Sequence, residues 1–73
     1  MKYDEFLKLV DRTSNSFNWR YGQSLMNVLY SVWPEKYNEI TQSGDDPYYR
    51  EDKIGQTLKS LKENWNPRNE NTK

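Results

Sequence analysis

A run of apolar residues with helical spacing, ending at a proline, constrains the fold of this chain more than any other feature. Large apolar side chains recur three or four residues apart, which places them on one face of a helix: Tyr21, Leu25, Val28, Leu29, Val32 and Trp33. Pro34 either ends this helix or begins another, because proline is tolerated at a first helical position but not in an interior. The sequence therefore predicts a helix that starts after Asn18, a residue type that caps helix N-termini, and ends before Pro34.

Two other segments have the same spacing. Near the start of the chain, a stripe predicts a helix over about residues 3–13, with acidic residues in its first turn. This stripe consists of Tyr3, Phe6, Leu7 and Val10. The polar run at 13–16 is expected to end that helix. Toward the other end, a stripe predicts a last helix with Asp52 as its cap. It consists of Ile54, Leu58, Leu61 and Trp65.

The segment between these helices predicts a short helical turn and then a sharp loop. After Pro34, Tyr37 and Ile40 continue a weaker apolar stripe, whereas residues 43–47 combine glycine, aspartate and proline in a strong turn signal. No strand-like alternation competes. We therefore expect an all-α fold, a small bundle of three main helices plus a short helical turn after Pro34. It should form a single domain over residues 1–65, and residues 66–73, which have no apolar side chain, should be a disordered tail.

The composition argues against an enzyme and against a cofactor or metal site. A chain of 73 residues buries only about 60% of its unfolded surface, so its core is marginal. Without cysteine or histidine it can build neither a disulfide nor a Cys/His zinc site, and its serines and threonines lack their usual general base. The acids at 45, 46, 51 and 52 fit a solvated turn that caps helices. Aromatic packing, association with another chain, or both remain as ways to stabilise such a core, and we expect a homodimer over a lone monomer.

The balance of charge limits the partners. Basic and acidic residues both number 11, so the net charge is zero and long-range attraction to nucleic acid is not encoded. No apolar run approaches the length of a membrane span, and the first residues do not form an apolar signal segment. We expect no membrane partner, and we expect the protein to work in the cytoplasm.

Aromatic and arginine side chains supply the candidate contact surface. Trp, Tyr and Arg are enriched at binding hot spots, and this chain has more of them than three short helices can bury. The predicted binding residues are Trp19, Arg20, Tyr30, Tyr48, Tyr49 and Arg50. For Tyr21 and Gly22 we favour a structural role, with Tyr21 in the core stripe and Gly22 admitting a neighbouring helix. Trp19 could also staple the entrance of its helix.

Two motifs give a resemblance to a known group of proteins. Arg20, Gly22, Gln23, Asn27 and Leu29 form an R-x-G-Q-x-x-x-N-x-L stretch, and residues 46–52 form a D-P-[FY]-[YH]-x-x-D turn. Over roughly residues 3–65 the chain resembles short proteins of tailed bacteriophages and prophages. The segment at 48–51 departs from the more acidic continuation of that group. The resemblance implies a phage accessory protein and carries no catalytic residue with it.

Three functional hypotheses follow. In the first, the chain binds and modulates a host protein, such as a defence component, through its aromatic and arginine surface. In the second, an oligomer sequesters a nucleotide signalling molecule, with rings stacked on its bases while Arg20 and Arg50 hold its phosphates. In the third, the chain is a virion or assembly component.

Overall fold

Four α-helices make up the described part of the protein. The computed structural model describes residues 1–44, 46–48 and 50–66. The helices are α1 (Tyr3–Phe17), α2 (Tyr21–Val32), α3 (Pro34–Ser43) and α4 (Ile54–Glu63), with a 3-10 turn η1 (Glu51–Lys53) before α4. The described residues contain no strand, which confirms the all-α prediction. The tail predicted for 66–73 falls, except for Asn66, outside the described residues.

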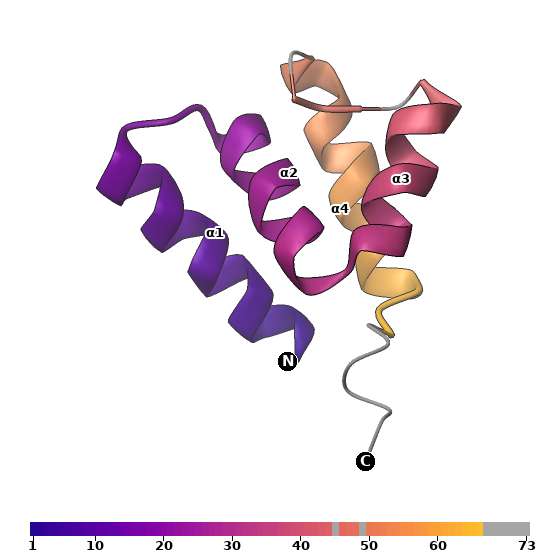
Figure 1. Ribbon diagram of the computed structural model, residues 1–73, viewed down its shortest axis with the longest axis horizontal. Coiled ribbons are helices and arrows are strands. Elements are labelled where there is room, and N and C mark those ends of the chain that lie inside the picture. The colour runs from indigo at the N-terminus through magenta and orange to yellow at the C-terminus, as the bar shows by residue number, and fades with distance from the viewer. Residues whose placement is uncertain (45, 49, 67–73) are drawn as a thin grey trace.

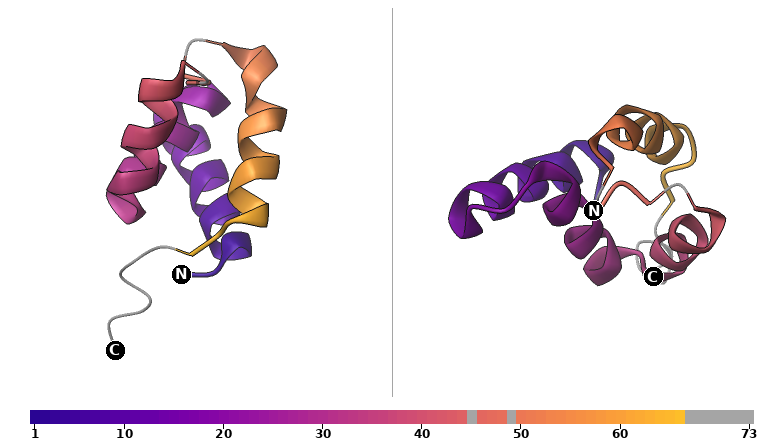
Figure 2. Two further views of the ribbon diagram at one scale, coloured as in Figure 1. Left: turned by 90° about the vertical axis from the view of Figure 1, so that its right-hand side faces the viewer. Right: turned by 90° about the horizontal axis from the view of Figure 1, so that it is seen from above.

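The helices alternate in direction (Figure 1). α1 and α2 form an antiparallel hairpin, and α3 turns back beside the end of α2 (Figure 1). α4 runs antiparallel to α3, behind α2 and α3 in the view of Figure 1 (Figure 2). The tightest helix packing joins α1 to α2 and α2 to α3. α2 is therefore the central helix of the fold, as expected from its strong apolar pattern.

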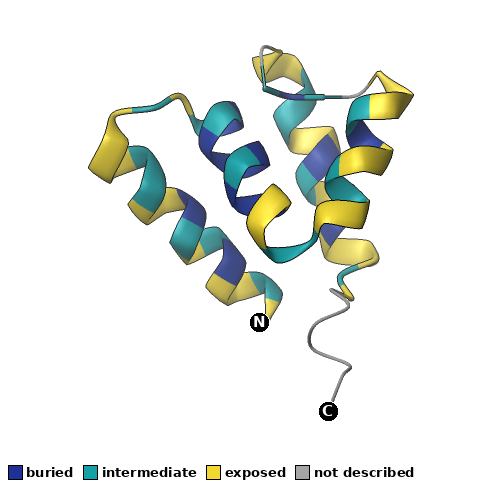
Figure 3. Cartoon of the chain, in the orientation of Figure 1, coloured by how far each residue is buried: buried dark blue, intermediate teal, exposed yellow. Residues whose placement is uncertain are grey.

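The core forms around α2 (Figure 3). Half of the buried hydrophobic residues lie on this helix, and the other half come from α1, α3 and α4. They are Phe6, Val10, Leu25, Met26, Val28, Leu29, Ile40 and Leu61. Burying a side chain of this size contributes about 1.5–3 kcal/mol. The three predicted main stripes thus supply nearly all of the core.

The boundary between α1 and α2 differs from the prediction. The polar run at 13–16 is helical, and α1 continues to Phe17. Asn18 does not cap α2; it ends α1 in the left-handed conformation with φ 56°, which asparagine tolerates better than most residues. Ser14 stabilises this end, because its carbonyl accepts from the Trp19 amide and its hydroxyl donates to the Trp19 carbonyl at 2.8 Å. Arg20, in an extended conformation, precedes α2.

The second half of the chain also corrects two predictions. The short turn expected after Pro34 is a helix of 10 residues, as long as α4, with the proline at its first position and Gly44 at its end. Asp52 does not cap α4. It lies in η1 and its carboxylate pairs with Arg50, while Lys53 precedes the helix.

The loop before α4 packs against the start of α2. Pro47 is fully buried, and a Cβ added to Gly22 would overlap its carbonyl oxygen. Gly22 therefore does admit a close neighbour, but that neighbour is this loop and not a helix as predicted. The contact joins the two sequence motifs of the chain, because Gly22 belongs to the first and Pro47 to the second.

Aromatic rings fasten the opposite end of α4. The Trp65 ring lies 5.6 Å from Tyr3, 4.9 Å from Phe6 and 5.4 Å from Trp33, measured between ring centroids. Its indole nitrogen donates to the Met1 carbonyl at 2.9 Å. We call Tyr3, Phe6, Trp33 and Trp65 the aromatic latch, because they tie the segment after α4 to α1 and to the end of α2.

Candidate functional site

Two aromatic rings stand side by side where α1 passes into α2. Phe17 and Trp19 are stacked, with ring centroids 4.7 Å apart and an interplanar angle of 21°. They meet because the left-handed Asn18 between them turns the chain sharply. Phe17 is 61% exposed, the highest value among the large hydrophobic residues described, whereas Trp19 is half-buried. We call Phe17 and Trp19 the aromatic edge.

An uncharged groove begins at the aromatic edge and runs between α1 and α2. Its volume is about 310 Å³. Its walls combine apolar and small polar side chains from both helices: Leu9, Thr13, Trp19, Asn27, Val28 and Ser31. Leu9 also borders a second hollow along α1, whose other walls are Met1, Glu5, Lys8 and Arg12. The surface therefore changes from apolar at the aromatic edge to charged toward the start of α1.

The structure divides the predicted binding residues into groups. Trp19 and Arg20 lie at the α1–α2 connection, and the contact of Gly22 with Pro47 places Tyr48 and Arg50 at the same end of the molecule. Tyr30 is not with them. It lies nine residues after the start of α2, about 14 Å along the helix axis, where it is 58% exposed and meets Tyr37 edge to face. Tyr49 lies outside the described residues.

Two of the predicted binding residues, Tyr48 and Arg50, lie in the loop before α4 and already interact with other residues of the chain. Two nitrogens of Arg50 donate to the carboxylate of Asp52, at 3.3 and 3.1 Å. This hydrogen-bonded ion pair raises the pKa of Arg50 and lowers the pKa of Asp52. Tyr48 is half-buried against the core, and its amide donates to the Asp46 carboxylate, so this acid holds the loop and does not cap a helix as predicted. The α1–α2 connection therefore offers the less occupied surface.

Phe17 was missed in the sequence. The polar run at 13–16 was expected to end the helix, so the residue that follows it was not assigned to that helix, although its spacing continues the apolar stripe. Phe17 lies seven residues after Val10 and so continues the apolar stripe of α1 by two further turns. It projects beyond the core because α2 begins only at Tyr21.

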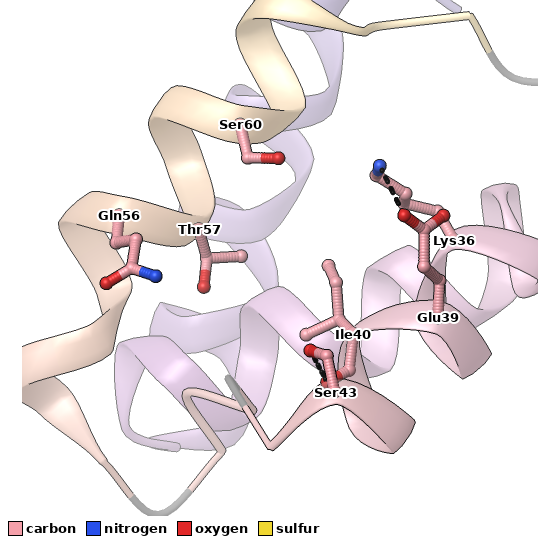
Figure 4. Close-up of a pocket in the computed structure, with 7 residues that line it drawn as sticks. All are labelled: Lys36, Glu39, Ile40, Ser43, Gln56, Thr57 and Ser60. Carbon is pink, nitrogen blue, oxygen red and sulfur yellow. Dashed lines mark hydrogen bonds and ion pairs between the residues drawn. The ribbon is translucent and has the colours of Figure 1, made fainter.

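A third hollow, which is polar, lies between α3 and α4 (Figure 4). It has a volume of about 210 Å³. Lys36 and Glu39 form an ion pair at 3.5 Å on the α3 side, and the Ser43 hydroxyl donates to the Ile40 carbonyl at 2.9 Å. Hydroxyl and amide groups of α4 face them (Figure 4). Because its cation and its anion compensate each other, this hollow has no unbalanced charge to offer a ligand.

The described residues define the class of the protein, a small all-α bundle with an aromatic-edged groove on its helical hairpin. Among residues 1–44, 46–48 and 50–66, no three histidine, cysteine, aspartate or glutamate side chains are grouped so that they could hold a metal ion. No helix in this part is long and apolar enough to span a bilayer. No protein-family model matches the chain, and no curated protein or solved structure is significantly similar to it.

Proposed function

We propose that this chain is a non-enzymatic accessory protein that binds and modulates a protein of a bacterial host cytoplasm. The resemblance to tailed-phage proteins supplies the biological setting. The observation that carries the proposal is the stacking of the exposed Phe17 ring on the half-buried Trp19 ring, which lines an uncharged groove. Arg20 follows directly and is exposed.

The physical support is the arrangement of the rings. A single exposed hydrophobic side chain is normal on a protein surface, but two ordered rings beside an apolar groove are typical of a contact site. Because stacking already restricts both side chains, little conformational entropy is left to lose when a partner covers them. The aromatic edge therefore suits a protein partner.

The nucleotide hypothesis receives less support. It requires Arg50 to hold phosphates, and this guanidinium is already engaged by the carboxylate of Asp52. A phosphate would have to displace that carboxylate first. We therefore propose protein binding alone.

Capture from a bacterial lysate tests the proposal. The immobilised chain should retain a specific host protein, and the variants Phe17→Ser and Trp19→Ser should each weaken that capture by about 30-fold, as expected for a hot spot of about 2 kcal/mol. Tyr30→Ser is the matched control, because it removes an aromatic ring of similar exposure at the other end of α2. Helix content by circular dichroism should be equal in all variants. Equal retention by Phe17→Ser and the unmodified chain would reject the assigned surface.

A further inference from the structure

Of the charged residues of α1, Glu5, Lys8 and Arg12 line the hollow that continues the groove, whereas Asp4 and Asp11 do not. Lys8 and Arg12 lie beside Leu9 at the hollow that continues the groove. The acids Asp4 and Asp11 lie elsewhere, near Tyr3 and Tyr21. Burial raises the pKa of both phenols, and the neighbouring acid raises it further in each case. A chain with no net charge thus has a basic rim along one groove.

The one acid that lines this hollow, Glu5, takes part in the cap of α1 and keeps its negative charge. The Glu5 carboxylate accepts a hydrogen bond from the Lys2 amide at 2.9 Å, as part of the cap that begins α1. Within the described residues, Lys8 and Arg12 take part in no ion pair. The two cations of this hollow therefore exceed its one acid by a single positive charge.

We propose that this groove binds an acidic amphipathic helix of the partner protein, an inference that rests on the proposed function. Apolar side chains of that helix would enter the groove between Leu9, Trp19 and Val28, and its carboxylates would lie beside Lys8 and Arg12. This is the helix-in-groove mode of recognition, in which an apolar face supplies affinity and flanking charges supply orientation and rate.

The dimensions of the surface fit such a segment. The two hollows together follow α1 from Met1 to Thr13, which corresponds to about 18 Å, or about three turns of a partner helix. Only one ring, Trp19, belongs to their walls. Single-stranded nucleic acid is usually held by successive stacked rings, so an acidic protein segment fits this surface better.

A peptide titration of the full-length chain tests the charge preference. The probes are synthetic amphipathic helices of about 16 residues that share leucine anchors and differ only in flanking glutamate, glutamine or lysine. With nitrogen-labelled protein, the Trp19 indole signal should move while the Trp33 signal stays in place. At low salt the glutamate peptide should bind about tenfold more tightly than the lysine peptide, and added salt should reduce this ratio.

Charge-reversed variants separate the rim from the overall charge. Lys8→Glu combined with Arg12→Glu should reverse the preference, and the corresponding glutamine substitutions should abolish it. Lys59→Glu combined with Lys62→Glu is the matched control, because it makes the same change of charge at exposed positions of α4. The control should keep the preference for glutamate peptides.

Any of four titration results would overturn the inference. They are equal or tighter binding of the lysine peptide by the unmodified chain, shifts confined to α3 and α4, the same Trp19 shift on raising the protein concentration alone, and a larger Trp19 shift with a single-stranded oligonucleotide. The third result would mean that a second copy covers the groove. If Phe17→Ser loses the captured host protein while the charge-reversed variant retains it, the inference fails and the proposed function stands. If the chain prefers the glutamate peptide but captures no host protein, the proposed function fails and the preference of the groove for an acidic helix stands.

Discussion

Alanine at Gly22 offers a sharp test of how the loop packs against α2. Replacing glycine by alanine inside a helix normally stabilises a protein by about 0.5–1 kcal/mol. At Gly22, however, the new methyl group would overlap the carbonyl oxygen of Pro47, and it would lie 3.2 Å from the Pro47 carbonyl carbon and 3.6 Å from Cδ1 of Ile54. Relieving the overlap requires a shift of the buried Pro47, and such overpacking costs about 1–3 kcal/mol.

The net expectation is that Gly22→Ala lowers the free energy of unfolding by about 1–2 kcal/mol. For a domain of this size, that corresponds to a melting temperature lower by about 5–15 °C. Urea denaturation followed by circular dichroism measures it, and an unchanged slope would show that the unfolded state is unaffected.

Gly55→Ala provides the matched control. Gly55 is the second residue of α4, just as Gly22 is the second residue of α2, and a Cβ there would meet nothing within 4 Å. The helix-propensity gain should be the same at both positions, so Gly55→Ala should stabilise the protein by about 0.5–1 kcal/mol. If the two substitutions stabilise the protein equally, the loop does not pack on Gly22 as described.

Two further predictions concern the aromatic latch. Trp65→Phe should lower the free energy of unfolding by about 1 kcal/mol, because the hydrogen bond to Met1 is lost. Trp65→Ala should lower it by about 2–3 kcal/mol, because the contacts with three rings are lost as well. Equal stability of the two variants in urea would contradict the assigned contacts. The Tyr3 hydroxyl donates to the Leu58 carbonyl at 3.1 Å, and burial raises its pKa above 10.0. Its contribution to stability should therefore be complete below the unfolded-state pKa and disappear as the pH rises through the higher folded-state pKa. When urea denaturation is repeated at rising alkaline pH, the free energy of unfolding should fall less for Tyr3→Phe than for the unmodified chain. An identical fall would show that the Tyr3 hydroxyl does not cause this pH dependence.

The sequence predicted the parts of the fold that depend on local spacing. The stripes around Leu25, Val10 and Leu61 placed three helices and most of the core correctly, because helical periodicity is a local signal. The prediction was weaker at 13–18, where serine and asparagine suit both a loop and a helix end. Here the hydrogen bonds between Ser14 and Trp19 stabilise the end of a longer helix.

The candidate site was only partly predictable. Trp19 and Arg20 could be chosen from residue type alone, and the length of the predicted helix already places Tyr30 near its other end. The contact between Gly22 and Pro47 joins positions 25 residues apart, and such a distant contact is set by the tertiary fold. It also gives the two sequence motifs of this chain a shared structural role, since each supplies one side of the same contact.

The attachment of α4 determines which part of the molecule can open. Pro47 fastens the segment before this helix and Trp65 the segment after it, while Leu61 anchors the helix in the core and its backbone makes few close contacts with the other helices. An element held in this way can detach as one rigid piece at a lower free energy than complete unfolding. Its departure would wet Leu61 but leave the α1–α2 hairpin assembled. Such opening would leave unchanged the hairpin that bears the proposed contact surface.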